Sequence, residues 1–411
     1  SAWFAGPKSE NGEAFADVIR RILEDHHYWR RNYFPEDGVA ITSETQRTHL
    51  PWNDRFQDRL LDLLAALKAD FPFQSPRYCA HMVAEQTLPS IAGYFAGMLY
   101  NPNNVTKEAA PVTVELELEA GRLIAEMLGY DGETSWAHLT GGGTIANAEA
   151  LWTARTVRYL PLVLRDVADE MDLDHPVRSE DSTRLLGMPP ADALDLLPEI
   201  FEGAATRHGD DPGTVRAVIE AYRDSHYNVA EAGLPAVCAR LGSRPVLVVP
   251  ETYHYCLDKI TDVLGIGRRS IHTVAVDERF RMDPRDLRRV LAQIDGADEH
   301  VLAVVAVMGT TEEGSLDPIH ELLDVRSERE ENGRPSFWLH ADAAYGGYLR
   351  TMMRPEPMDQ GPARRTVSVR ERELELDLPL PNDDLYRPLE RLGECDSAVV
   401  DPHKLGYVPY P

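Results

Sequence analysis

Five mostly apolar runs, several of them rich in β-branched residues, follow one another through the carboxyl-terminal half of the sequence. They are Pro245 to Pro250, Ser270 to Val276, Val301 to Met308, Phe337 to Ala341 and Ser397 to Val400. Helical segments such as Pro284 to Leu291 separate them. Strands that are apolar throughout and joined by helices are typical of a parallel sheet buried on both faces. The sequence therefore predicts an α/β fold with a mainly parallel sheet covered by helices.

Helical periodicity dominates the sequence before these runs. Apolar residues recur near helical spacing from Asn11 to Trp29, and Asp58 to Leu67 and Val112 to Leu128 indicate two further helices. We expect an amino-terminal helical arm over residues 1–110 and a large α/β domain over residues 111–411.

Two segments of the expected large domain carry no recognisable motif. Residues 165–244 are rich in acidic residues and indicate two short helices, which favours a peripheral insertion. The stretch from Pro355 to Asp384 is charged and contains prolines without a clear apolar period, which favours a surface loop.

The charge of the chain limits its partners. Lys and Arg number 42 against 68 Asp and Glu, a formal net charge of -26. Such a surface repels nucleic acid and anionic membranes. No apolar run reaches the roughly 20 residues that span a bilayer, and residues 1–12 lack the layout of a signal peptide. We therefore expect a cytoplasmic protein.

The cysteines form no recognisable metal or disulfide pattern. The four are scattered without a C-x-x-C pair: Cys79, Cys238, Cys256 and Cys395. This spacing fits reduced, mostly buried thiols better than a disulfide framework or a zinc site, so we expect no metal.

A glycine turn, Thr140-Gly141-Gly142-Gly143-Thr144, opens a helix predicted over Ile145 to Leu160. Glycines let the backbone approach a ligand, and the free N–H groups at a helix start form a cradle for phosphate. A plain structural turn explains the same residues equally well. The absence of G-x-G-x-x-G and G-x-x-x-x-G-K argues against a dinucleotide or a nucleoside triphosphate.

An aspartate, Asp342, follows the Phe337 run and leads into the small residues from Ala343 to Gly347. Small residues leave room for a flat ligand, and a buried carboxylate needs a cationic partner. The protonated pyridine nitrogen of pyridoxal phosphate would be such a partner. A structural aspartate at a strand end is the alternative interpretation.

The last apolar run ends in Asp401-Pro402-His403-Lys404. A lysine that forms a Schiff base must be shielded and rigidly aimed, and Lys404 is the only lysine that follows a predicted strand. His403 and Ser397 are candidate donors to a phosphate. The other four lysines fall in predicted loops or helices: Lys8, Lys68, Lys107 and Lys259.

An imidazole, His254, follows the first apolar run. Stacked on a cofactor ring, it would restrain the ring and lie within reach of the substrate carbon. A histidine buried for packing alone is the alternative. Because the carboxyl ends of parallel strands meet at one edge of a sheet, we expect the four motifs to form one site.

Two of these motifs together, His340 to Tyr345 and Asp401 to Lys404, resemble the group II pyridoxal-phosphate-dependent amino-acid decarboxylases. Within that group the chain is most similar to the bacterial tyrosine decarboxylases, over nearly its whole length. The segments that carry this similarity are Trp3 to Lys8, Asn32 to Asp37, Ser75 to Tyr78, Met98 to Asn104, Thr311 to Gly314 and Asp401 to Tyr410.

The resemblance implies fold type I of the pyridoxal-phosphate-dependent enzymes, the aspartate aminotransferase-like fold, and pyridoxal 5'-phosphate as cofactor. It implies that Lys404 binds the aldehyde and Asp342 pairs with the pyridine nitrogen. His254 and Ala344 would lie on the two faces of the ring. The implied phosphate ligands are Gly143, Thr144, Ser397 and His403.

The resemblance also implies residues near the substrate. Thr310 and Thr311 match a threonine turn close to the cofactor, and His81 falls near the pocket for the substrate side chain. Tyr410 is the candidate proton donor to the α-carbon. Family members continue past the lysine into a mobile loop and a small carboxyl-terminal domain, so this chain resembles a part of them. A separate carboxyl-terminal chain is one partner that this resemblance implies.

The implied activity is decarboxylation of an L-amino acid, aromatic by resemblance, with tyrosine giving tyramine and carbon dioxide. The implied assembly is a homodimer. Two alternatives remain open from the residues alone. The same fold and cofactor serve a lyase, an aminotransferase or a desulfurase, and a catalytically incomplete subunit would carry the same motifs.

Overall fold

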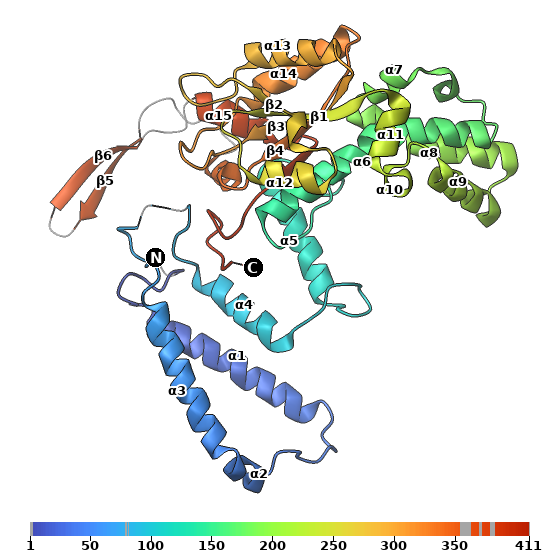
Figure 1. The fold of residues 1–411 in the computed structure, drawn as a ribbon. Coiled ribbons are helices and arrows are strands. Elements are labelled where there is room, and N and C mark those ends of the chain that lie inside the picture. The colour runs from blue at the N-terminus through green and yellow to red at the C-terminus, as the bar shows by residue number, and fades with distance from the viewer. Residues whose placement is uncertain are drawn as a thin grey trace. The chain divides into compact units, whose positions relative to one another are not determined.

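The computed structural model describes residues 3–78, 80, 82–353, 363–369, 372–378 and 383–410. The chain forms two compact units (Figure 1), one of Ser1–Glu115 with Pro402–Pro411 and the other of Leu116–Asp401. Our predicted division differs from this one, because it ends the arm at residue 110 and keeps the last ten residues with the sheet. The predicted domain boundaries stay a prediction.

Within the described residues, a five-stranded parallel sheet forms the centre of the larger unit (Figure 1), in the order β2-β1-β3-β4-β7. The register places Val305 opposite His340 and Asp342 opposite Val399. The strands are β1 (Arg244–Pro250), β2 (Ile271–Val274), β3 (Glu299–Val307), β4 (Trp338–Asp342) and β7 (Ser397–Val399). Each overlaps a predicted apolar run, and the predicted α/β fold is confirmed.

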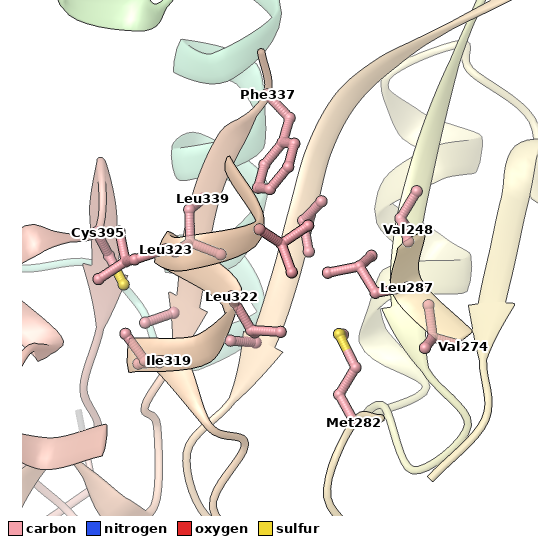
Figure 2. Close-up of a cluster of buried hydrophobic side chains, with 14 of the residues drawn as sticks. Val248, Val274, Met282, Leu287, Ile319, Leu322, Leu323, Phe337, Leu339 and Cys395 are labelled. Atoms are coloured by element: carbon pink, nitrogen blue, oxygen red, sulfur yellow. The ribbon is translucent and has the colours of Figure 1, made fainter. Parts of the chain in front are cut away.

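Helices cover both faces of this sheet. Successive residues of a strand point to opposite faces, and because the strands are apolar on both, each face needs a cover. On one face Val248 and Leu339 pack against α13 (Pro284–Asp295) and α14 (Ile319–Glu331), as Figure 2 shows. On the other face Leu247, Val249 and Val305 pack against α6 (Gly143–Glu170) and α12 (Cys256–Val263). The second face is the one that presents α6 to the ends of the strands.

Helix α6 is longer than the predicted segment, which stops at Leu160. It continues through Pro161, and its second half forms a separate core with the helices of residues 165–244. That segment holds more helices than the two predicted, so the estimate of two is wrong. They are α7 (Ser182–Leu186), α8 (Pro190–His208), α9 (Pro212–Asp224), α10 (Val229–Ala232) and α11 (Leu234–Leu241).

The prediction of a surface loop for Pro355 to Asp384 is wrong in its described part. Strands β5 (Ala363–Val369) and β6 (Arg372–Leu378) form an antiparallel hairpin, with Val367 opposite Leu374. The sequence from Glu373 to Leu378 alternates acidic and leucine residues, which is the period of a strand. We missed this period because the run is short and rich in charge.

The helical arm forms the smaller unit and is largely exposed. The ring of His26 on α1 (Gly12–Asn32) lies 5.0 Å from that of Tyr100, the last residue of α4 (Leu88–Tyr100). Two further helices are α2 (Ser43–Thr48) and α3 (Leu50–Leu67), and no residue of α3 is buried. None of the helices in the described part of the chain has the length and apolar sequence needed to cross a bilayer.

The remaining elements link the sheet and its helices. Helix α5 (Thr113–Leu128) precedes α6, and α15 (Asp383–Glu390) precedes β7. Short 3-10 helices occur at Pro176–Ser179, Arg268–Ser270, Gly346–Met352 and Leu392–Glu394. The described cysteines, Cys238, Cys256 and Cys395, are free thiols.

We expect truncation of Leu322 to destabilise the larger unit. Leu322 on α14 is fully buried in the cluster of Figure 2. Leu322→Ala should lower the free energy of unfolding by about 2–5 kcal/mol, because a buried cavity is left behind. Leu194→Ala, at a leucine of α8 that is 46% exposed, should change it by about 0.5 kcal/mol or less. Urea unfolding followed by circular dichroism compares the two, and equal losses would contradict the packing described here.

Candidate active site

Asp342 is the last residue of β4 and is 5% exposed. The backbone N–H of Ala344 donates to its Oδ1 over 3.3 Å. The small residues that follow are required by close packing: Gly346 N donates to Met308 O over 2.7 Å, and a Cβ on Gly346 would collide with that oxygen. The turn after β4 therefore lies against the end of β3, which fixes the direction of the Asp342 carboxylate.

A chain of buried hydrogen bonds leads away from Asp342. Asn147 Nδ2 donates to Asp342 Oδ2 over 3.1 Å, and Asn147 Oδ1 lies 2.8 Å from His340 Nε2. His340 Nδ1 lies 2.8 Å from Ser397 Oγ, which also accepts from Trp338 Nε1 over 2.8 Å. These five side chains link α6, β4 and β7.

Our sequence reasoning assigned no role to Asn147. A signal for it was present, because Asn147 lies four residues after Gly143 and such residues share one face of a helix. A polar residue on the face that a glycine turn presents to the sheet would have been a candidate. Likewise, Trp338, His340 and Asp342 alternate along β4 and therefore point to the same face of the sheet.

The amino end of α6 is open on one side. Gly142 has a φ of +118°, and a Cβ on Gly141 or Gly142 would meet no atom within 4 Å. No side chain in the described residues caps this 28-residue helix at its amino end. An uncapped helix start with room beside its glycines is suited to bind a phosphate.

Gly143 has a different explanation from the one that the sequence suggested. A Cβ on Gly143 would lie 2.8 Å from Asp401 Oδ1, so glycine is required there by the carboxylate of Asp401. Asp401 is 5% exposed, and its N–H donates to Ala344 O over 3.1 Å. A carboxylate beside a helix start is favourable because it meets the positive end of the helix dipole.

His254 lies between the end of β1 and the start of α12. Its Nδ1 accepts from the backbone N–H of Cys256 over 3.2 Å, and its ring lies 4.2 Å from that of Tyr255. The hydroxyl of Thr252, two residues earlier, is buried without a hydrogen-bond partner among the described residues. The end of β1 thus presents an imidazole whose Nδ1 is held by the backbone N–H of Cys256.

The threonine turn after β3 separates its two members. Thr310 is 2% exposed, and its hydroxyl accepts from Ser315 N over 3.0 Å. Thr311 is exposed in the turn that follows. Between the two, the structure gives Thr310 the inward position.

Three predicted residues, His403, Lys404 and Tyr410, belong to the smaller unit. The ring of His403 stacks on that of Tyr410, with centroids 4.2 Å apart and planes at 29°. Lys404 O accepts from Tyr407 N over 3.4 Å. Lys404 lies three residues beyond Asp401 in the chain, and His81 lies outside the described residues.

The larger unit thus connects several predicted residues by direct contacts. Asp342 contacts Ala344, Ala344 contacts Asp401, and Asp401 lies against Gly143. Ser397 does not take part in these direct contacts. It lies opposite His340, two residues before the end of β4, and reaches Asp342 only through His340 and Asn147. Its predicted role as a phosphate ligand stays a prediction, and its observed partners are side chains of β4.

Comparison with known proteins identifies the fold and its relatives. Residues 190–363 match the pyridoxal-dependent decarboxylase conserved domain. The L-tyrosine decarboxylases of Levilactobacillus brevis and Enterococcus faecalis are each 31% identical to this chain, over 100% of its length and 62% of theirs. The chain is thus similar to pyridoxal-dependent decarboxylases. It spans less than two thirds of the length of these curated relatives.

Two solved structures share the fold at low sequence identity. Mouse CSAD in apo form covers 97% of the chain at 18% identity with a TM-score of 0.52. A glutamate decarboxylase domain from Vibrio parahaemolyticus covers 97% at 17% identity, also with a TM-score of 0.52. They confirm the predicted fold type, and the match to the family confirms the predicted resemblance and its cofactor, pyridoxal 5'-phosphate.

Acid should weaken the fold through His340. Burial lowers the pKa of His340 from 6.5 to about 4. At a pH between these values His340 is protonated in the unfolded protein and neutral in the folded protein. Stability is therefore unaffected above about pH 7 and is lost as pH falls below 6.5. His340 should contribute about 2 kcal/mol to the loss of unfolding free energy between pH 7 and pH 5.

Chemical unfolding at both pH values measures this contribution. His340→Gln should lose about 2 kcal/mol less than the wild type on acidification, whereas His226→Gln, at an exposed histidine, should lose as much as the wild type. Equal losses in wild type and His340→Gln would show that His340 is not held neutral.

Proposed function

We propose that this chain binds pyridoxal 5'-phosphate and forms the site of a decarboxylase that acts on an aromatic L-amino acid, with tyrosine as the first candidate. The observation that carries the proposal is the buried carboxylate of Asp342, held at the carboxyl end of β4 by Asn147 and the backbone of Ala344. The 31% identity to L-tyrosine decarboxylases over the whole chain supports the choice of substrate.

The residues present fit the cofactor chemically. Asp342 is an ionisable acceptor suited to a protonated pyridine nitrogen, and the uncapped start of α6 is suited to a phosphate. Around the ring we assign His254 and Ala344 to its two faces and Lys404 to its aldehyde. The assigned phosphate ligands are Gly143, Thr144 and His403, with Thr310 and Thr311 close by. The hydroxyl of Ser397 is instead occupied by His340 and Trp338.

The side chains of this chain divide the chemistry among them. When bound, the cofactor supplies an electron sink for the electron pair left on the α-carbon as carbon dioxide departs. Asp342 would hold a proton at the ring nitrogen, and Lys404 would hold the cofactor through its aldehyde. Tyr410, or His254 acting with a water, delivers a proton to the α-carbon. The reaction consumes one proton and releases the amine.

The choice of an aromatic substrate comes from the relatives. Tyrosine is named for bacterial enzymes that match the whole chain, and L-aspartate or tyrosine for archaeal relatives that match shorter stretches. We assign His81 to the pocket for the substrate side chain. The whole-chain matches favour an aromatic side chain over an acidic one.

A panel of L-amino acids tests the activity. The protein loaded with pyridoxal 5'-phosphate is incubated with each amino acid, and amines are detected by mass spectrometry. We expect tyramine from tyrosine, reduced about 100-fold or more in Lys404→Ala. Lys68→Ala, at a residue next to α3, should keep wild-type activity.

Borohydride reduction separates the possible failures. A pyridoxyl adduct on the Lys404 peptide without any amine would contradict decarboxylation by this chain and favour another reaction or an incomplete subunit. Absence of any adduct would contradict the assignment of Lys404 itself.

We also propose that the chain forms a homodimer through its helical arm. Helix α3 exposes a series of large apolar side chains that an isolated chain would leave in water: Trp52, Phe56, Leu61, Leu63, Leu64 and Leu67. Contiguous exposed apolar surface of this kind marks protein interfaces. A two-fold partner would bury these side chains against its own copy.

Light scattering after size exclusion tests the dimer. We expect twice the chain mass of 46.0 kDa for the wild type. Phe56→Ser with Leu63→Ser should shift the mass to that of one chain, because two apolar anchors are lost. Gln57→Ser on the same helix should leave the dimer intact, and a wild-type mass of one chain at micromolar concentration would refute the assembly.

A further inference from the structure

The hydrogen bonds behind Asp342 form one continuous chain of side chains. From the carboxylate inward, Asp342, Asn147, His340, Ser397 and Trp338 are joined at 3.1, 2.8, 2.8 and 2.8 Å. His340 is fully buried and Asn147 is 2% exposed. The chain begins at a carboxylate, which when ionised only accepts, and ends at an indole N–H, which only donates.

The chemistry of the two ends gives the chain one direction. An ionised Asp342 accepts, so Asn147 must present its amide nitrogen to it and its oxygen to His340. The second Asn147 Nδ2 proton points to Cys256 Sγ, 3.7 Å away, which is also an acceptor and supports the same amide orientation. Asn147 Oδ1 can only accept, so His340 Nε2 must carry a proton.

The inner half of the chain follows from the charge of His340. Burial lowers the pKa of His340 to about 4, so the ring carries a single proton at neutral pH. Because that proton is on Nε2, Nδ1 is bare and accepts from the Ser397 hydroxyl. Ser397 Oγ in turn accepts from Trp338 Nε1, so each of the four donors has one acceptor in the chain.

We propose that Asn147, His340, Ser397 and Trp338 are positioning residues, whose one-way chain of hydrogen bonds holds Asp342 as an ionised, fixed acceptor for the cationic ring of the cofactor. No member of the chain touches the reaction itself. The hydrogen bonds act through Asp342, because the donors Asn147 and Ala344 fix the direction of its carboxylate. The link to the cofactor rests on the proposed function, whereas the direction of the chain does not.

The direction is measurable without any cofactor. Nitrogen-15 spectra of histidine-labelled protein at pH 7 report which ring nitrogen carries the proton. We expect His340 to be neutral with its proton on Nε2, and its signals to be identified by their shift in Ser397→Thr, which keeps the hydroxyl. A proton on Nδ1, or a charged ring at pH 7, would overturn the proposal.

Cofactor binding tests the consequence for Asp342. The dissociation constant of pyridoxal 5'-phosphate, measured by fluorescence titration, should rise about 10-fold in Asn147→Ala, because a donor to a charged group is lost. Ser397→Ala should weaken binding and Ser397→Thr should restore it. Binding within twofold of the wild type in a folded Asn147→Ala protein would overturn the positioning role.

The two measurements separate this inference from the proposed function. The Nε2 tautomer of His340 in a wild-type protein that binds no cofactor would support the proposed direction of the hydrogen bonds and overturn the proposed function. Tight binding of the cofactor and amine formation by a protein with the Nδ1 tautomer of His340 would support the proposed function and overturn the proposed direction of the hydrogen bonds. Should Asn147→Ala fail to fold, the tautomer of the wild type and the Ser397 pair still decide the question.

Discussion

The buried carboxylate of Asp342 imposes the strictest requirement on this structure. A charge removed from water is costly unless donors replace the lost hydration. The backbone of Ala344 and the amide of Asn147 supply such donors from two different elements. The end of β4 and the first turns of α6 must therefore keep a fixed relation, and the packing of α6 on the sheet maintains it.

Helix α6 connects the candidate site to the helical layer that surrounds its distant half. Its first turns face the strand ends, its middle packs on the sheet through Leu151 and Ala154, and its last turns enter a separate core. A single long helix thus packs both on the sheet and in the core of that helical layer. The glycines at this start are explained by two different constraints, the φ of +118° at Gly142 and the Asp401 carboxylate at Gly143.

Much of the sheet was predictable because each buried strand leaves an apolar run in the local sequence. A strand buried on both faces is mostly apolar, and each of the five apolar runs proved to overlap a strand. The hairpin of β5 and β6 was missed because its alternation of Glu373 with Leu374 signals a strand with one face in water, which a search for continuous apolar runs overlooks. The predicted helix stops at Leu160, directly before Pro161, whereas α6 continues through this proline and packs in a second core.

The sequence by itself determined the strands, the motifs at their ends and the family resemblance, since these depend on residue type and spacing. It pointed to Asp342, His254 and Lys404 because a carboxylate, an imidazole and a lysine after apolar strands are chemically unusual. Only the tertiary structure decided which neighbours complete them. Asn147 and Asp342 are 195 residues apart, and no local pattern encodes a hydrogen bond between side chains brought together by the packing of a helix on a sheet.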